Sequence, residues 1–239
     1  LDSDTLLYHI GLSIDRLKLL LTEQMKAGIC FESEHPTDKN VCNDMEQNVV
    51  QKVNAFIAQL TEIRRKLYTD VIAAYNGDPA AKSIGEVIFC YPGIRAISNY
   101  RIAHALLILD VPLIPRIISE LAHSETGIDI HPGAEIGDYF MIDHGTGVVI
   151  GETSVIGNNV KMYQGVTLGA RSFPLDENGN PIKGIVRHPR IGNNVIIYSN
   201  STILGNITVG DGAVIGGNLW VDSDVPAGAK LSQDDKLKR

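Results

Sequence analysis

Three histidines in the second half of the chain, His131, His144 and His188, are the side chains best suited to acid–base chemistry near neutral pH. His144 stands out because it directly follows Asp143 and precedes a glycine-rich run, Gly-Thr-Gly. Asp129 lies earlier in the same stretch, and a carboxylate close to an imidazole fixes its tautomer and raises its basicity. We therefore expect His144 to act as a general base that Asp129 orients. The alternative is that the histidines occupy ordinary surface or corner positions and that Asp129 is a turn residue.

A metal centre and a cysteine nucleophile both fit the sequence poorly. Zinc sites on repeat scaffolds use a pair of closely spaced histidines, whereas the three histidines here are widely separated along the chain. Cys30, Cys42 and Cys90 lie far apart in the first half, and their odd number argues against a disulfide framework. Cys90 lies in an apolar run, which predicts a buried, inert thiol. We expect no metal ligands, no tightly bound cofactor and a reducing compartment.

The net charge of −7, from 21 Lys and Arg against 28 Asp and Glu, disfavours nucleic acid as a partner. An anionic ligand would therefore need a local basic cluster. One stretch holds such a cluster, made of Arg171, Lys183, Arg187, His188 and Arg190. The longest apolar runs fall far short of the roughly 20 residues that cross a bilayer, and the first residues show no targeting pattern. These features predict a cytoplasmic protein without a membrane partner.

Apolar residues spaced by three and four predict that the first half, 1–126, is an α-helical domain. The longest stripe runs from Val49 to Ile72, and a less regular one runs from Leu6 to Leu21. The segment from Phe31 to Asn43, which contains Pro36 and has no apolar rhythm, is the predicted connector. Further helices are predicted at Ser83 to Phe89, Ile94 to Leu109 and Pro115 to His123.

The run Asn76-Gly77-Asp78-Pro79 predicts the end of the long helix and the start of the next. Glycine suits the position just after a helix, and proline suits the first helical position. Asp78 is then the predicted N-cap, because an aspartate side chain can accept a hydrogen bond from the free amides of the first turn.

After about residue 127 an aliphatic residue returns every six positions. The registers are Ile130, Ile136, Ile142 and Val148; then Ile150, Ile156, Met162 and Leu168; and then Ile191, Ile197, Ile203, Val209, Ile215, Val221 and Ala227. This period fits neither an α-helix nor a flat strand, but it is typical of a parallel β-helix with three six-residue faces per coil. Glycines are expected at tight corners, at Gly137, Gly151, Gly157, Gly192 and Gly210. The sequence predicts a left-handed β-helix over 127–230 and a tail over 231–239.

Two interruptions of the period indicate where a site could lie. The register slips by two residues between Val148 and Ile150, just after His144. The separation of Leu168 from Ile191 is not a multiple of six, and the segment between them is rich in proline and glycine, so we expect a loop at about 169–190 to leave the coil. A full coil holds about 18 residues. The separation of Asp129 from His144 is close to one coil, so the two can lie on neighbouring coils.

An all-helical domain followed by five motifs resembles the serine O-acetyltransferase family. The motifs are Asp129-Ile-His-Pro-Gly-Ala-Glu-Ile-Gly, Asp143-His144-Gly-Thr-Gly-Val-Val-Ile-Gly-Glu-Thr, Gly165-Val-Thr-Leu-Gly, Arg187-His188-Pro-Arg-Ile-Gly and Ile203-Leu-Gly-Asn-Ile-Thr-Val-Gly. The match runs from about Gly77 to Pro226. Sugar and antibiotic acetyltransferases share the coil but lack this helical domain and the Asp-Ile-His-Pro opening, so the resemblance is more specific than the repeat alone.

The resemblance implies that the acetyl group of acetyl-CoA is transferred to the hydroxyl of L-serine, giving O-acetyl-L-serine and CoA in the first committed step of cysteine biosynthesis. By the same resemblance, His144 is the general base, Asp129 orients it, and the serine oxygen attacks the thioester directly. The family positions that hold the substrate amino acid match Asp78, Asp143, Arg187, His188 and Glu152. Carboxylates on the ammonium group and an arginine on the carboxylate agree with charge pairing.

The resemblance also implies how the co-substrate lies. Acetyl-CoA in this family follows the groove between coils, with its pantetheine amides bonded to the backbone. The matching positions are Gly169, Ala170 and Gly205, which are small enough to let the backbone come close. Ala170 stands where the family usually has a second glycine.

Assembly and regulation are implied in the same way. Family members form trimers with active sites shared between adjacent chains, so we expect a homotrimer, and a dimer of trimers stays open because Phe31 to Asn43 differs from bacterial relatives. L-Cysteine is expected to be a feedback inhibitor at the serine site. The sequence lacks the Gly-Val-Pro-Ala-Arg run and the terminal isoleucine of the family. We expect either that the tail is truncated here or that the complex with O-acetylserine sulfhydrylase is absent.

Two rival hypotheses remain open from the sequence. One is a CoA-dependent acetyltransferase that acts on another hydroxyl acceptor, such as a sugar. The other is a repeat scaffold with a vestigial site, which predicts no release of CoA with any acceptor. Thiol release from acetyl-CoA with a panel of acceptors distinguishes all three hypotheses.

Overall fold

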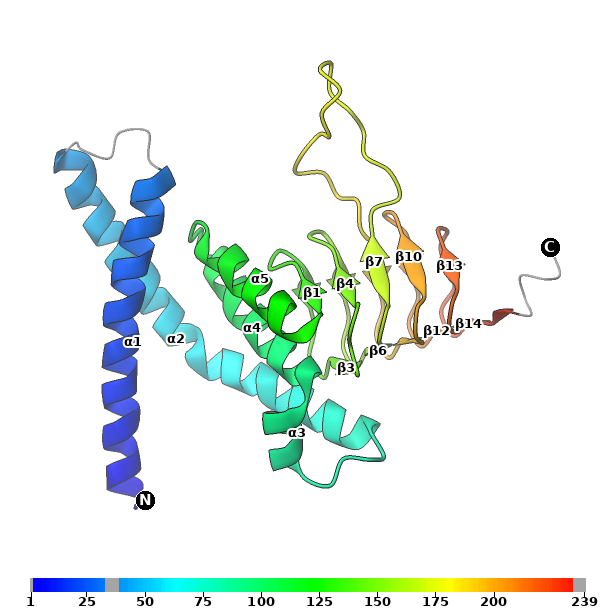
Figure 1. The fold of residues 1–239 in the computed structure, drawn as a ribbon, viewed down its shortest axis with the longest axis horizontal. Helices are drawn as coiled ribbons and strands as arrows, with labels where there is room; N and C mark the ends of the chain where they lie inside the picture. Colours follow the sequence, from blue (N-terminus) through cyan, green and yellow to red (C-terminus); the bar gives the residue numbers. More distant parts are fainter. Residues whose placement is uncertain (1, 33–38, 234–239) are drawn as a thin grey trace.

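The computed structural model describes residues 2–32 and 39–233, which form a helical half followed by a stack of short strands (Figure 1). The two long helices, α1 and α2, cross each other, and α3, α4 and α5 connect them to the strands (Figure 1). The helices are α1 Ser3–Glu32, α2 Lys39–Gly77, α3 Ile84–Cys90, α4 Pro92–Leu107 and α5 Ile114–Thr126. The predicted order of a helical part and then a repeat part is confirmed.

The predicted connector from Phe31 to Asn43 is wrong at both ends. Helix α1 continues through Glu32 and α2 already begins at Lys39, while 33–38 lie outside the described residues. A helix propagates through its own backbone hydrogen bonds once it has begun. It therefore does not need an apolar stripe over its whole length.

The prediction that Asp78 caps a helix is also wrong. Residues 78–83 form an irregular turn, and α3 starts at Ile84 with Ser83 as its N-cap. The Ser83 hydroxyl accepts a 3.1 Å hydrogen bond from the amide of Glu86, whose carboxylate accepts one from the Lys82 amide at 2.8 Å. Serine followed three residues later by glutamate is the stronger helix-start signal, and it leaves Asp78 free for other contacts.

The second half is a parallel β-solenoid of 14 short strands in the described residues. They are β1 Asp129–Ile130, β2 Glu135–Ile136, β3 Met141–Asp143, β4 Val149–Ile150, β5 Val155–Ile156, β6 Lys161–Tyr163, β7 Thr167–Gly169, β8 Arg190–Ile191, β9 Ile196–Ile197, β10 Thr202–Leu204, β11 Thr208–Val209, β12 Val214–Ile215, β13 Trp220–Val221 and β14 Lys230–Leu231. They form three sheets, which we call A (order β1-β4-β7-β10-β13), B (β11-β8-β5-β2) and C (β14-β12-β9-β6-β3). From β1 to β13 consecutive strands fall in consecutive sheets, so each complete coil contributes one strand to each face, as the six-residue period predicts. After β13 the chain makes an isolated bridge, Val209 with Val225, before β14 in sheet C.

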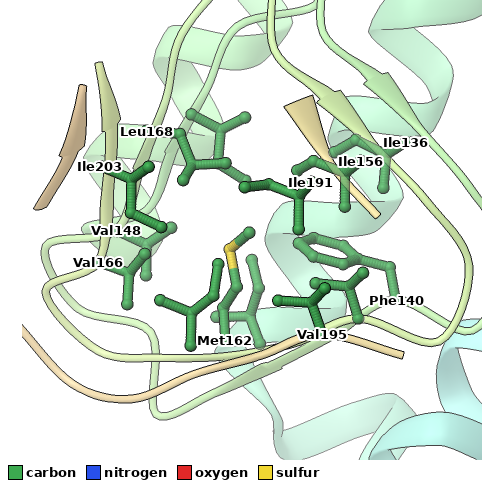
Figure 2. Packing of buried hydrophobic residues seen from close by; sticks show 14 of the residues in the cluster. Ile136, Phe140, Val148, Ile156, Met162, Val166, Leu168, Ile191, Val195 and Ile203 are labelled. Carbon is green, nitrogen blue, oxygen red and sulfur yellow. The ribbon is translucent and has the colours of Figure 1, made fainter. Parts of the chain in front are cut away.

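The aliphatic residues of the repeat stack inside the solenoid. In sheet B, Ile136 pairs with Ile156 and Ile156 with Ile191, and Figure 2 shows the three side chains in one row. Phe140 fills the interior beside them and is fully buried (Figure 2). A side chain at the corner glycine Gly157 would lie 2.8 Å from the carbonyl carbon of the next coil. Stacking at this spacing therefore needs glycine there.

Both predicted interruptions are present. Asp129 pairs with Val149, and Val149 pairs in turn with Thr167, so the coil that begins at Asp129 is longer by two residues than the coil that follows it. The extra length falls at the turn between β3 and β4, where His144 has a φ of +56°. Between β7 and β8 the chain leaves the solenoid as a long projecting loop (Figure 1).

A buried ion pair fixes the helical half to the first coil. Arg101 of α4 donates to Asp70 of α2 at 2.8 and 2.9 Å, and both side chains are almost fully buried. Arg101 also donates to the carbonyls of Ile136 and Gly137, and Asp70 accepts from the Phe140 amide at 3.0 Å. This network holds the C-terminal half of α2 against the turn that precedes β3. No helix within the described ranges is long and apolar enough to cross a membrane.

Candidate active site

His144 lies on the turn between β3 and β4 and points into solvent. Its side chain is 76% exposed, and its Nε2 lies 3.9 Å from Asp143 Oδ1. The left-handed backbone at His144 turns the chain out of the coil at this position. The result is a solvent-accessible imidazole with a carboxylate nearby.

Asp78 lies close to this imidazole and is held by two donors. The Tyr91 hydroxyl donates to Oδ2 at 2.5 Å and the Ala80 amide donates to Oδ1 at 2.8 Å. The hydrogen bond from Tyr91 is the main cause that lowers the pKa of Asp78, and the nearby Lys161 and His144 lower it further. The Lys161 ammonium bonds the Gly77 carbonyl at 2.6 Å. We call Asp78, Asp143 and His144 the His144 edge of the site.

A second group gathers around Arg187, where the loop rejoins the solenoid. Arg187 Nη2 donates to Glu152 Oε2 at 2.7 Å, and this bond is the main cause that lowers the pKa of Glu152. The Thr153 hydroxyl accepts from the amides of Arg187 and His188 at 3.0 and 3.2 Å. We call Glu152, Thr153, Arg187 and His188 the Arg187 edge.

His188 is buried and neutral within the Arg187 edge. It is 6% exposed, and burial, aided by the charge of Arg187, lowers its pKa to about 4. Nδ1 accepts from the Thr153 amide at 3.0 Å and lies 2.8 Å from the Thr153 hydroxyl. This bonding pattern assigns the proton to Nε2, so the ring offers one N–H donor.

The two edges border sheet A on opposite sides. The chain turns through the His144 position as it enters sheet A at β4, and it leaves sheet A after Ile150 through the turn that carries Glu152. Asp129 precedes the buried Ile130 and therefore faces outward on the same sheet. Among the described residues no hydrogen bond or ion pair joins Asp129 to His144, and the orienting role of Asp129 stays a prediction.

The residues expected to hold the pantetheine arm lie where the loop leaves the solenoid. Gly169 ends β7, Ala170 follows it, and the Gly205 amide donates to the Gly169 carbonyl at 3.0 Å. Gly205 has a φ of +91° and lines a cavity of about 330 Å³ that Arg187 also lines. The structure thus brings Gly169 and Gly205 together, next to the Arg187 edge.

Sequence reasoning missed Tyr91 and Thr153. The Tyr91-Pro92-Gly93 run separates two helices, and that signal alone does not show that the phenol reaches Asp78. The expectation of a buried Cys90 is wrong, because Cys90 is exposed at the end of α3, where Val87 is the buried residue. No group of three or more His, Cys, Asp or Glu side chains suited to a metal ion occurs in the described part of the chain.

The chain is similar to a known family model over one segment and to curated proteins over most of its length. The family model described as bacterial transferase hexapeptide (six repeats) matches residues 188–222. A plasmid-encoded serine acetyltransferase of Synechococcus elongatus is 53% identical over 234 residues, which cover 98% of this chain and 73% of that protein. The chain belongs to the serine acetyltransferase family. The predicted membership is thereby confirmed, and with it the prediction that the chain is an acyltransferase enzyme.

Two solved structures of the serine acetyltransferase family share the fold. The crystal structure of Entamoeba histolytica serine acetyltransferase 1 in complex with L-cysteine has a TM-score of 0.82 at 41% identity, over 94% of this chain and 77% of that one. A serine acetyltransferase in complex with CoA has a TM-score of 0.65 at 32% identity, over 77% of this chain and 73% of that one. The fold likeness therefore spans the helical half as well as the solenoid.

Proposed function

We propose that this chain uses acetyl-CoA as donor and L-serine as acceptor, with His144 as the general base, giving O-acetyl-L-serine and CoA. The main support is the accessible His144 imidazole beside Asp143 and Asp78, in a chain 53% identical to a serine acetyltransferase. In this proposal Nε2 of His144 takes the hydroxyl proton while the serine oxygen attacks the thioester carbon. The C–S bond of the thioester then breaks, and the sulfur takes the proton back from His144, so that CoA leaves as the thiol and no acyl-enzyme forms.

The charges of the two edges suit a zwitterionic amino acid. The low pKa of Asp78 keeps that carboxylate ionised near neutral pH, so with Asp143 it can hold the ammonium group. Arg187 offers a guanidinium for the substrate carboxylate. In the proposal Glu152 keeps this guanidinium in place, and the neutral His188 donates one further hydrogen bond without adding charge.

The position of the edges on opposite borders of sheet A supports a shared site. We propose that the His144 edge of one chain meets the Arg187 edge of a second copy in a homotrimer, with a dimer of trimers left open. Mixing His144→Asn and Arg187→Gln subunits under dissociating conditions and reassembling them tests this arrangement. The reassembled mixture should regain activity, because some sites then combine an intact His144 edge with an intact Arg187 edge. A mixture that stays as inactive as each variant alone would refute the shared site.

L-Cysteine has the ammonium and carboxylate of serine with a thiol in place of the hydroxyl. It would therefore occupy the same groups, and a related enzyme has been crystallised with it. We propose competitive inhibition by L-cysteine with respect to serine. Such feedback accords with the proposed place of the enzyme in the cytoplasm, at the first committed step of cysteine biosynthesis.

The testing experiment measures the loss of thioester ultraviolet absorbance from acetyl-CoA, because the thiol of added cysteine would react with a thiol dye. L-Serine should support turnover, and L-cysteine should raise the serine KM. D-Serine, L-threonine, glycerol and a hexose form the acceptor panel. Turnover with the hexose but not with L-serine would favour the rival sugar acetyltransferase, and no turnover with any acceptor would favour a vestigial scaffold.

A further inference from the structure

The cavity beside Gly205 extends from the Arg187 edge to a charged pair that the mechanism above does not use. Its walls come from the base of the loop and from the coils of β10 and β13, and Arg187, Gly205, Arg171 and Asp222 all line it. Arg171 is the second residue after β7, and Asp222 directly follows β13. The pair thus joins the root of the loop to the solenoid two coils further along.

The ion pair between Arg171 and Asp222 is weak and open. Its closest atoms, Nη2 and Oδ2, are 3.4 Å apart, and the side chains are 63% and 38% exposed. Exposed pairs of this kind contribute little to stability, because solvent screens the two charges. A ligand with a stronger negative charge would therefore displace Asp222 from Arg171 at little cost.

The solenoid places this pair at a defined distance from the acceptor groups. Glu152 follows β4 and Asp222 follows β13, and the sheet order β4-β7-β10-β13 puts three strand spacings between them (Figure 1). At about 4.8 Å per spacing this is roughly 14 Å. The pantetheine arm between the thioester and the diphosphate of CoA has about the bond count of four to five extended residues, roughly 14–16 Å.

We propose that Arg171 exchanges Asp222 for the diphosphate of acetyl-CoA, and that Asp222 opposes the same phosphates. The proposal rests on the proposed function, since it takes acetyl-CoA as the donor. In a chain with a net charge of −7 an anionic donor needs a local cation, and Arg171 is the guanidinium at the matching distance. Arg171 then determines specificity for the nucleotide part of the donor, whereas the reacting groups contact only its thioester.

The first arm of the experiment compares acetyl-CoA with S-acetylpantetheine, which carries the same arm without phosphates. Arg171→Gln should raise the KM for acetyl-CoA about 5- to 20-fold and leave the KM for S-acetylpantetheine within twofold. Lys183→Gln is the matched control, because it removes one positive charge from the same loop outside the cavity. An equal effect of Arg171→Gln on both donors, or an effect no larger than that of Lys183→Gln, overturns the proposal.

The second arm tests the opposing carboxylate. Asp222→Asn should lower the KM for acetyl-CoA about two- to fivefold, while Glu177→Gln, which neutralises a carboxylate at the loop tip, should not. This decrease in KM should disappear when Asp222→Asn is combined with Arg171→Gln, because it requires the guanidinium of Arg171. A rise in KM with Asp222→Asn would contradict the proposal.

Titration calorimetry with CoA and with pantetheine separates this proposal from the proposed function. Arg171→Gln should weaken the binding of CoA by the same factor as the KM and leave the binding of pantetheine unchanged. If wild-type protein binds CoA in this Arg171-dependent way yet acetylates no acceptor, the proposed function fails and the inference stands. If it acetylates serine without this dependence, the inference fails alone.

Discussion

The phenol of Tyr91, just before α4, donates a 2.5 Å hydrogen bond to Oδ2 of Asp78, just after α2. Two helices thereby fix one carboxylate whose other oxygen is bonded by the Ala80 amide. The same bond raises the pKa of Tyr91 to about 12, so the phenol stays a donor across the working pH range. The helical half thus supplies one carboxylate of the proposed site and orients it.

Replacing Tyr91 by phenylalanine should raise the KM for L-serine about three- to tenfold and leave kcat within twofold. The reason is that Asp78 loses a donor that holds it in place, while the reacting groups are unchanged. Steady-state kinetics at saturating acetyl-CoA measures this effect. Tyr68→Phe, an exposed tyrosine of α2, is the control, and an equal response of the two variants would remove Tyr91 from the site.

His144→Asn should lower kcat by about 10²- to 10⁴-fold, the usual contribution of a general base. Asparagine tolerates the left-handed backbone at this position, so the melting temperature should stay within a few degrees. The dissociation constant for CoA, measured by titration calorimetry, should change less than twofold. A variant that keeps a tenth or more of the wild-type kcat would show that another group removes the proton.

Asp70→Ala should lower the free energy of unfolding by about 3–5 kcal/mol, because it leaves the guanidinium of Arg101 buried without its carboxylate. Burial raises the pKa of Asp70, and the hydrogen bond from Arg101 opposes that rise. Denaturant unfolding of Asp70→Ala, Arg101→Met and the double variant measures the coupling. The double variant should lose clearly less free energy of unfolding than the two single variants lose together. If the losses simply add, the two residues do not depend on each other as predicted.

Gly151→Ala should disturb the Arg187 edge without touching a charged group. An added Cβ would overlap Nε2 of His188, so the ring must leave its bonds to Thr153. We expect a lower melting temperature and a serine KM raised about tenfold. Gly11→Ala in α1 meets open space and serves as the control. A Gly151→Ala enzyme with wild-type kinetics would show that the position of His188 does not matter for serine binding.

The buried His188 should make the fold less stable in mild acid. Its pKa is about 4 in the folded chain against about 6.5 when unfolded. The unfolded state therefore binds more protons between these values, and the free energy of unfolding falls as the pH drops from about 6.5 to about 4. Urea unfolding measures the free energy of unfolding at pH 7 and at pH 5. The decrease between the two pH values should be smaller for His188→Gln than for wild type. An unchanged difference would mean that the ring is already protonated in the fold.

The solenoid could be predicted closely because its coils repeat one packing rule. Ile136, Ile156 and Ile191 point inward on sheet B for the same reason, so the six-residue period assigns each of them within its own register. The slip before Ile150 and the loop after Leu168 were predictable as departures from that period. A local pattern is enough where every contact is made with the equivalent residue of the next coil.

The helical half was harder to predict because its contacts are not periodic. The burial of Asp70 depends on Arg101 and on a turn of the solenoid, and the sequence around Asp70 carries no sign of either partner. The contact of Asp78 with Tyr91 depends on the path of residues 78–83, where Ser83 and not Asp78 begins the helix. The site residues were predictable as types, but their division between two borders of sheet A came from the topology.

The even spacing of the later coils gives the protein a built-in unit of length. Thr202 pairs with Trp220 exactly one coil later in the chain, and a tandem duplication of the segment 202–219 would add one complete rung without changing which side chains face inward. Asp222 would then move about 4.8 Å further along the axis. An engineer could use such rungs to match the enzyme to thioester donors with longer arms.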